Sequence, residues 1–379
     1  MIDTPIYDIA IIGGGLGGLT FALQAIQQGY SVALFEKETY PFHKVCGEYI
    51  SLESWNFLTS LGVPLDSFKL PIIKHLLITD VLGNNYSFNL PLGGFGISRF
   101  FLDNYLYQLC IQKGVDVYQQ TKVNDVTFSN DVFTISTQHK TIQSKIAIGS
   151  FGKRSNVDVK FKRSFALSKP NKLNNFIGVK YHVQYNIPSN QIALYNFKNG
   201  YCGISKIEDN KVCVCYITSA SNLNNNQQSI QQMEELVLSK NPFLKKIFAD
   251  AYFLYDKPLS ISQINFQSKS KIENHIFCIG DAAGLIAPLC GNGMSMAMHS
   301  SKIAFNNVHL FLQGEISRSK AEQQYILQWN KQFKQRLFIG KMVQYWFGNN
   351  TLTICFLRIM KALPFLAKWV IKSTHGQPF

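Results

Sequence analysis

The feature that most constrains the fold of this chain is a run of glycines close to its N-terminus. Gly13, Gly15 and Gly18 have the spacing G-x-G-x-x-G, and Gly17 adds a further glycine. The run lies between segments with the hydrophobic pattern of a βαβ unit, and Glu36 closes the second strand. The predicted elements are a strand at 6–12, a helix at 19–28 and a strand at 31–35. A chain that begins in this way is expected to form an α/β fold with a parallel sheet.

Each part of this unit suits the binding of a dinucleotide. Glycines let the backbone approach a pyrophosphate, and the amides and dipole at the start of the helix stabilise its charge. Glu36, with Lys37 beside it, is placed to contact the ribose of an adenosine. An acid at this position favours an unphosphorylated ribose, and therefore FAD or NAD over NADP.

A second glycine-rich turn follows a buried strand predicted at 276–279. Its sequence resembles the Gly-Asp motif of the FAD-dependent p-hydroxybenzoate hydroxylase superfamily, with the proline and the G-x-G-M that follow the motif there. The resemblance implies that Asp281 holds the ribityl chain of FAD. It also implies that residues 288–294 pass beside the isoalloxazine ring and open a helix whose N-terminus stabilises reduced flavin. The implied contacts are Gly280, Asp281, Pro288, Gly291, Asn292, Gly293 and Met294.

Three other stretches bear on this resemblance. The helix predicted at 98–112 is led by Arg99, which the family places near the FAD phosphates. The Asp-Gly motif of the family should fall at 149–155, but Phe151 replaces the acid, so its usual contact is not assigned. The loop at 41–51 contains Lys44-Val45-Cys46-Gly47 and is most similar to the geranylgeranyl reductase group. That similarity implies that Cys46 and Gly47 lie against the flavin and makes Cys46 the candidate catalytic residue, with an inert packed thiol as the alternative.

The resemblance implies a Rossmann-like FAD-binding domain, an inserted antiparallel β-sheet substrate domain and a C-terminal helical segment. We expect the FAD-binding domain at 1–75, 95–165 and 268–312. The substrate domain is expected at 76–94 and 166–267, and the helical segment at 313–379.

The formal net charge of +14 is concentrated at the C-terminus. From Ile316 onward the chain has ten lysine and arginine residues and one acid, Glu322. Segments 333–347 and 352–371 mix these cations with aromatic and aliphatic residues, as in helices that lie on anionic lipid. The alternative is that they pack on the catalytic domain and close the substrate cavity. We find no nucleic-acid-binding module, and we expect no nucleic acid partner.

The eight cysteines include no C-x-x-C pair, so reduced thiols and no metal site are expected. No apolar run has the length of a membrane span without charge or proline. These patterns predict a cytoplasmic protein, with peripheral membrane contact as the alternative.

The motifs predict an FAD-dependent oxidoreductase with an apolar small-molecule substrate, and they leave the reaction open. In the first hypothesis, NADH or NADPH binds transiently and reduces FAD, which passes hydride to a carbon–carbon double bond. In the second, a monooxygenase hydroxylates an aromatic or polyketide ring. In the third, FAD is structural in a non-catalytic, membrane-associated protein. The loop with Cys46 favours the first, and the lack of the W-x-W-x-I-P motif argues against flavin halogenation.

Overall fold

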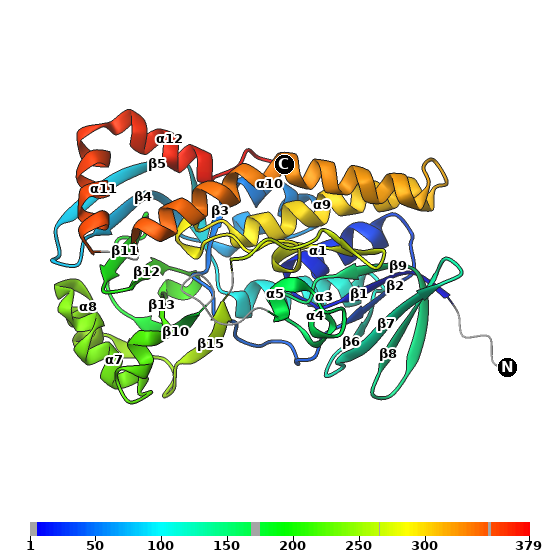
Figure 1. The fold of residues 1–379 in the computed structure, drawn as a ribbon, viewed down its shortest axis with the longest axis horizontal. Helices are drawn as coiled ribbons and strands as arrows, with labels where there is room; N and C mark the ends of the chain where they lie inside the picture. Colours follow the sequence, from blue (N-terminus) through cyan, green and yellow to red (C-terminus); the bar gives the residue numbers. More distant parts are fainter. Residues whose placement is uncertain (1–5, 168–174, 265, 348–349) are drawn as a thin grey trace.

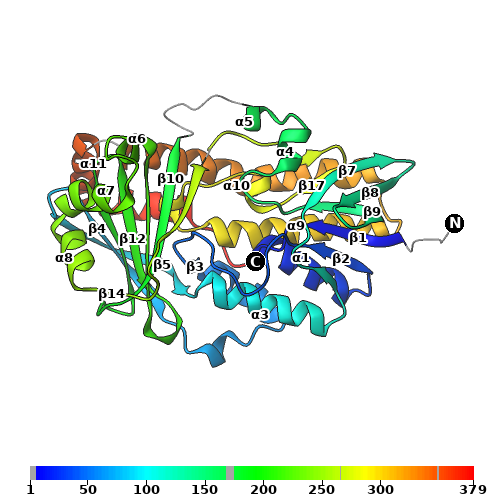
Figure 2. The ribbon, with the colours of Figure 1, turned by 90° about the horizontal axis from the view of Figure 1, so that it is seen from below.

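The computed structural model describes residues 6–167, 175–264, 266–347 and 350–379 (Figure 1). Parts of the predicted domain ranges, namely residues 1–5, 168–174, 265 and 348–349, lie outside the described residues. Two mixed β-sheets lie side by side; α10 (Arg318–Phe347) runs along both of them, and α9 (Gly293–Leu312) runs along the first (Figures 1 and 2). The predicted α/β class is confirmed.

The first sheet is centred on five parallel strands in the order β17-β9-β1-β2-β6. The strand predicted at 6–12 is confirmed as β1, and it pairs with β2 and β9. Strand β16 and the hairpin β7–β8 extend the sheet in antiparallel directions. The bounds are β1 Ile6–Ile12, β2 Val32–Phe35, β6 Asp116–Tyr118, β7 Val123–Ser129, β8 Val132–Thr137, β9 Thr141–Gly149, β16 Ile272–Glu273 and β17 Ile276–Cys278.

Both faces of β1 are buried, which explains its nearly continuous apolar sequence. Ile9 and Ile11 pack in the core that includes α1 (Leu16–Gln27), α3 (Arg99–Gln112) and α9 (Gly293–Leu312). Ala10 and Ile12 point the other way, into a core shared with β7 and β8. Successive residues of a strand face opposite sides, so one short strand contributes to two cores. This arrangement fixes the position of the glycine turn at the carboxyl end of β1, in the middle of the parallel strands.

The second sheet has the order β14-β10-β13-β12-β11-β4-β5-β3, with β15 paired to β10. It is antiparallel apart from the parallel pair β4 and β11. Helices α6 to α8 cover one face and the C-terminal helices cover the other. Its strands are β3 Tyr49–Ser51, β4 Ile72–Thr79, β5 Asn85–Gly96, β10 Phe176–Gln184, β11 Gln191–Phe197, β12 Gly200–Lys206, β13 Val212–Ser219, β14 Tyr252–Phe253 and β15 Leu259–Ile264.

The C-terminal segment is helical, as predicted, and it packs on both halves of the molecule. Tyr325 of α10 donates a hydrogen bond to the carbonyl of Cys278 in the first sheet. Phe356 and Leu357 of α11 and Ala367 of α12 lie in a core with the second sheet. The remaining helices are α2 Trp55–Ser60, α4 Asn156–Lys160, α5 Ser164–Leu167, α6 Ala220–Asn224, α7 Ile230–Leu236, α8 Pro242–Asp250, α10 Arg318–Phe347, α11 Asn350–Ala362 and α12 Pro364–Thr374.

Several predicted boundaries differ from those observed. Helix α1 begins at Leu16 and not at Leu19, so Gly17 and Gly18 lie inside its first turn. The loop expected at 41–51 ends in β3, because these residues pair with the far end of β5. The domain boundaries expected at 75/76 and 94/95 fall inside β4 and β5, which belong to the second sheet along their whole length. In the described ranges, no helix is long and apolar enough to cross a membrane.

Candidate active site

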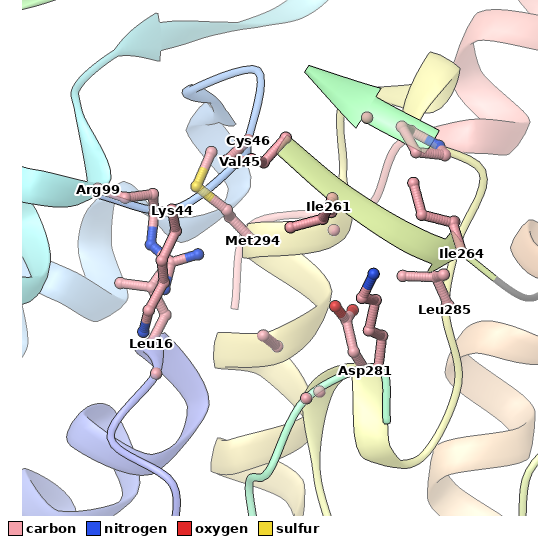
Figure 3. Close-up of a pocket in the computed structure, with 18 of the residues that line it drawn as sticks. Leu16, Lys44, Val45, Cys46, Arg99, Ile261, Ile264, Asp281, Leu285 and Met294 are labelled. Atoms are coloured by element: carbon pink, nitrogen blue, oxygen red, sulfur yellow. The ribbon is translucent and has the colours of Figure 1, made fainter. Parts of the chain in front are cut away.

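A cavity of about 1100 Å³ opens between the two sheets and the start of α9, and it gathers most of the predicted site residues (Figure 3). Two predicted residues, Gly18 and Asn292, do not line it. Those that do are Gly13, Gly15, Gly17, Glu36, Lys37, Cys46, Gly47, Arg99, Gly280, Asp281, Pro288, Gly291, Gly293 and Met294. Residues from four separate stretches of the chain, 13–17, 36–47, 99 and 280–294, therefore meet at one place.

The glycine turn needs glycine for close packing as well as for access. Gly13 has φ +104°, and a Cβ built there would lie 2.3 Å from the carbonyl oxygen of Ser150. A Cβ on Gly18 would lie 2.2 Å from the carbonyl oxygen of Gly13. Gly18 therefore packs against the backbone of the turn, while Gly13, Gly15 and Gly17 line the cavity. Glu36 accepts a hydrogen bond of 2.9 Å from the amide of Gly14, which holds its carboxylate against the turn.

Two cations lie beside the N-terminus of α1. Arg99 donates from Nε and Nη2 to the two carboxylate oxygens of Asp103, and both hydrogen bonds are 2.7 Å long. Lys44 Nζ lies 3.1 Å from the same carboxylate. Both cations approach the position of a Cβ on Gly15 to 3.9 Å. Figure 3 shows Arg99 and Lys44 converging toward Leu16 at the start of α1. This corner combines free helix amides with two cations, which is the chemistry that a pyrophosphate requires.

Asp281 lies in a single helical turn, Gly280–Ala282, and its carboxylate faces the cavity on the same side as Ile261 and Leu285 (Figure 3). Burial raises the pKa of this carboxyl, while the charge of Lys269 opposes the rise. Lys269 Nζ donates to the carbonyl oxygens of Asp281 and Lys153 over 2.7 Å each. Among the described residues, the carboxylate oxygens of Asp281 have no hydrogen-bond donor, so they are available to the hydroxyls of a ligand.

The stretch from Pro288 to Met294 reaches the cavity and then opens α9 at Gly293. Gly291 has φ +65°, and a Cβ there would lie 2.9 Å from the ring of Tyr49. Asn292 turns away from the cavity, is fully buried, and donates from Nδ2 to the carbonyl of Thr374. The position of Asn292 departs from the expected cofactor contact, because its amide connects the start of α9 to the end of α12.

Cys46 lies where the cofactor motifs meet the apolar end of the cavity. Burial raises the pKa of its thiol, so the sulfur holds its proton at neutral pH. Figure 3 places Cys46 and Val45 beside Met294 and across from Ile261. The aliphatic residues that line the adjoining space come mainly from the second sheet and the 285–289 turn: Leu76, Leu90, Ile192, Leu194, Ile217, Ile261, Ile264, Leu285 and Leu289.

A buried charged cluster holds the loop that carries Cys46. Glu48 pairs with the ammonium of Lys180, accepts from His182 Nε2 over 2.5 Å, and accepts from the amide of Arg99 over 2.8 Å. Lys180 also donates to the carbonyl of Lys44 over 3.1 Å. Burial would raise the pKa of Glu48, but the Lys180 charge and the His182 hydrogen bond bring it below the ordinary value. The carboxylate is therefore ionised and fully occupied by donors.

The same cluster offers three atoms of metal-ligating type. Ligand atoms of Glu48, His182 and Cys213 lie within 4.8 Å of one another. The ammonium of Lys180 already neutralises Glu48, and burial raises the pKa of the Cys213 thiol. A neutral thiol and an occupied carboxylate are poor ligands for a metal ion, so we assign the cluster a structural role.

Five residues around the cavity were not predicted as site residues from the sequence: Lys44, Glu48, Asp103, Lys180 and His182. Arg99 and Asp103 are four residues apart on a predicted helix, so their ion pair could have been predicted from the sequence. Lys180 and His182 share one face of an otherwise apolar strand, which was a weaker signal. Nothing local marked Glu48 as their partner, because it lies 132 residues from Lys180 and 134 from His182.

The fold and this site define an FAD-binding protein. The FAD binding domain family matches residues 6–323, and the chain belongs to this family.

Relatives and solved structures name several reactions. The chain is 24% identical over 338 residues to conditioned medium factor receptor 1 of Dictyostelium discoideum, covering 80% of this chain and 63% of that protein's length. It is 22% identical to digeranylgeranylglycerophospholipid reductase of Methanocaldococcus jannaschii, over 79% of this chain and 76% of the relative. A geranylgeranyl bacteriochlorophyll reductase-like protein from Thermoplasma acidophilum has a similar structure, with a TM-score of 0.75, 16% identity, and 98% and 92% of the two chains covered. A flavin-dependent brominase matches with a TM-score of 0.75, 17% identity, and 98% and 93% coverage.

Proposed function

We propose that this protein transfers hydride from reduced FAD to a carbon–carbon double bond of an apolar, isoprenoid-like substrate. The observation that carries the proposal is the position of Cys46, a protonated thiol between the cofactor motifs and the aliphatic end of one cavity. The reductase relatives named above support the same reaction class.

The residues of the cavity fit FAD. The amides of the glycine turn, with Arg99 and Lys44, would hold the pyrophosphate, and Glu36 would contact the adenosine ribose. The unpaired carboxylate of Asp281 would accept from the ribityl hydroxyls, and the start of α9 at Gly293 would face the ring. When bound and reduced, FAD supplies the hydride, and NADH or NADPH is the donor that we expect to reduce it.

Reduction of a double bond also needs a proton, which the chain must deliver. The thiol of Cys46 would give its proton to one of the two carbons of the double bond. The charges of Arg99 and Lys180 lower the free energy of the thiolate that remains, although burial has the larger effect on its pKa. The thiolate then recovers a proton from water, because the cavity is open to solvent.

The aliphatic residues at the far end of the cavity would bind the substrate and exclude water from the reacting carbons. Residues of β4, β11 and β15 contribute to this surface, with Leu285 and Leu289 from the turn before α9. A surface of this kind favours a hydrocarbon chain over a polar ring, because burying an unpaired polar group is costly.

The alternative is oxygen-dependent hydroxylation of an aromatic or polyketide substrate in the same cavity. The resemblance of the segment at 280–294 to the p-hydroxybenzoate hydroxylase superfamily supports it, because that superfamily is named for a hydroxylase. The two reactions differ in their need for oxygen, so they can be separated in one experiment.

The test uses the FAD-loaded protein, reduced with dithionite under nitrogen and mixed with a digeranylgeranyl glycerophospholipid in detergent. We expect oxidised-flavin absorbance to return without oxygen, and mass spectrometry to find two hydrogens added for each double bond reduced. Cys46→Ala should keep FAD but slow this step by roughly 10²–10⁴-fold, the usual contribution of a positioned acid. Cys278→Ala, a buried cysteine outside the cavity, is the matched control.

A different result would support a rival function. Flavin that stays reduced until air enters, followed by hydroxylated product, would establish the monooxygenase alternative. Product that carries halogen when bromide or chloride is present would establish halogenation. Full activity of Cys46→Ala would remove the thiol from the reaction.

A further inference from the structure

Exposed hydrophobic side chains are concentrated on the C-terminal helices. Of the twenty large hydrophobic residues that are exposed in the described parts of the chain, nine lie between residues 338 and 369. They are Phe338, Met342, Tyr345, Trp346, Leu352, Ile359, Leu363, Phe365 and Trp369. We call them, together with the exposed cations of the same helices, the C-terminal face.

Helix α12 shows how this face is built. Phe365 and Trp369 are 71% and 54% exposed and lie one helical turn apart. Lys368 and Lys372 are exposed on the same side of the helix, because positions 365, 368, 369 and 372 share one face at helical spacing. The opposite side of α12, which includes Ala367, is buried against the second sheet. The outward stripe of α12 thus alternates large aromatics with lysines.

Helices α10 and α11 repeat the pattern. Phe338, Lys341, Met342 and Tyr345 are exposed at helical spacing near the end of α10. On α11, the exposed residues include Leu352, Cys355, Arg358, Ile359 and Lys361. The three helices pack against one another at one end of the molecule, with α11 and α12 at the upper left of Figure 1.

The charge of this face has one sign. The sequence contains no aspartate or glutamate after Glu322. Among the described residues, the one cation beyond that point with an ion-pair partner is the buried Arg336, which pairs with Glu53. The exposed lysines and arginine of α11 and α12 therefore present an uncompensated positive surface around exposed aromatic side chains.

We propose that the C-terminal face docks on a lipid bilayer that contains anionic lipids. Aromatic side chains favour the level of the lipid headgroups, and lysines beside them reach the phosphates through long apolar stems. Charge complementarity identifies the partner, because an all-positive surface with exposed aromatics suits an anionic interface. The protein lies on the bilayer, since the described helices include none that could span it.

A second cavity lies between the C-terminal helices and the site. It has a volume of about 70 Å³, lies beneath α10, α11 and α12, and is lined by apolar residues such as Phe347, Met360 and Val370. It shares Leu76, Leu194, Leu289, Cys290 and His375 with the large cavity. Docking would therefore place the apolar end of the large cavity on the side of the molecule that faces the lipid, which suits an apolar substrate. This part of the inference rests on the proposed function, whereas the docking itself does not.

The test is flotation of the FAD-loaded protein with vesicles of phosphatidylcholine, alone or mixed with phosphatidylglycerol. We expect binding to the mixed vesicles that weakens as salt rises, because ions screen the exposed charges. Phe365→Asp/Trp369→Asp should abolish binding, and Lys368→Gln/Lys372→Gln should weaken it by about fivefold for each lysine removed. Bound vesicles should also slow maleimide labelling of the exposed Cys355 on α11.

The matched control is Leu236→Asp/Tyr252→Asp. These residues are 55% and 69% exposed, close to the values of the aromatic pair, but they lie on α7 and β14. Equal loss of binding in the control, or no binding of the wild type to mixed vesicles, would overturn the proposal. A concentration-dependent dimer that Phe365→Asp/Trp369→Asp dissociates would instead identify the face as a contact between two copies of the chain. None of these measurements requires turnover, so a failed reductase assay leaves the docking result intact.

Discussion

Glu48 and Lys180 form an ion pair in which both side chains are fully buried, directly beneath the loop that carries Cys46. The pair joins a loop next to the FAD motifs to a strand of the second sheet. His182, on the same strand, donates from Nε2 to the second carboxylate oxygen of Glu48. One carboxylate thus fixes the loop that carries Cys46 against the sheet that forms the aliphatic end of the cavity.

Removal of one partner should be costly, because it leaves the other charge buried and unpaired. We expect Lys180→Met to lower the free energy of unfolding by about 3–5 kcal/mol, with recovery of part of the loss in Lys180→Met/Glu48→Gln. Urea unfolding followed by circular dichroism measures both values. Lys211→Met is the control, because Lys211 forms an exposed pair with Asp209 and should cost less than about 1 kcal/mol.

The effect of Lys180→Met should also depend on pH. The folded-state pKa of Glu48 lies below its ordinary value, so its ionised form contributes stability above the unfolded pKa and loses it as pH falls. The difference in stability between the wild type and Lys180→Met should therefore shrink in acid. A difference that stays constant or grows as pH falls would show that the ion pair does not determine it.

Asp281→Asn should weaken the binding of FAD. The substitution keeps the size of the side chain but removes the charge that would accept from ribityl hydroxyls. A loss of ~1.5–3 kcal/mol, or about 10- to 150-fold in Kd, is typical for a charge-assisted hydrogen bond. Titration of the apoprotein with FAD measures it, and Asp250→Asn, at an exposed position on α8, is the control. An unchanged Kd would show that the Asp281 carboxylate does not contribute to FAD binding.

Asn292→Ala tests whether the Asn292 side chain contacts FAD, as the sequence motif implies, or connects α9 to α12, as the structure shows. If the side chain connects α9 to α12, its loss should cost about 1–3 kcal/mol of stability, because the carbonyl of Thr374 stays buried without a donor. The affinity for FAD should not change. The exposed Asn306→Ala on α9 should alter neither quantity. Lower FAD affinity at unchanged stability would instead favour the cofactor contact inferred from the motif.

Alkylation should separate Cys46 from the exposed Cys355. Only the thiolate reacts with iodoacetamide, and burial raises the pKa of Cys46, so we expect Cys355 to be labelled first at neutral pH. Labelling of Cys46 should accelerate as pH rises and slow when FAD is bound. Peptide mass spectrometry follows both sites, and a Cys355→Ser variant isolates the slower reaction. Rapid labelling of Cys46 at neutral pH would contradict its role as a proton donor.

The purified protein should release FAD, not FMN, on denaturation. Glu36 and the glycine turn lie at the end of the cavity that would hold the adenosine half, which FMN lacks. Chromatography of the released flavin against FAD and FMN standards measures this directly. FMN alone, or no flavin after incubation with excess FAD, would contradict the reading of this turn.

Local sequence predicted the parts of this protein that depend on backbone geometry. A Cβ on Gly13 or Gly18 would collide with a backbone carbonyl oxygen, so this turn restricts its own composition at these two positions. The strand at 6–12 was readable because both of its faces are buried. The start of α1 was predicted three residues late, since Gly17 and Gly18 weaken a helical pattern that packing nevertheless stabilises.

The sequence predicted some properties of the C-terminal segment, and the tertiary structure decided others. Its composition predicted basic, amphipathic helices, but composition left open whether they pack on the protein or face a membrane. The structure buries Leu357 and Ala367 and exposes Phe365 and Trp369, so the inner faces close the second sheet while the outer faces stay open. Apolar residues on all sides of these helices gave no local signal for which side would be buried.

The sequence by itself determined the glycine turn, the Gly-Asp segment and their order along the chain, because each depends on residues close together. Only the tertiary structure decided that Glu48 meets Lys180 and His182, and that Asn292 faces α12 and not the cavity. A buried charge is stable only beside a partner, and that partner can come from any part of the chain. The pairing therefore depends on how the two sheets pack, which no local pattern of residues specifies.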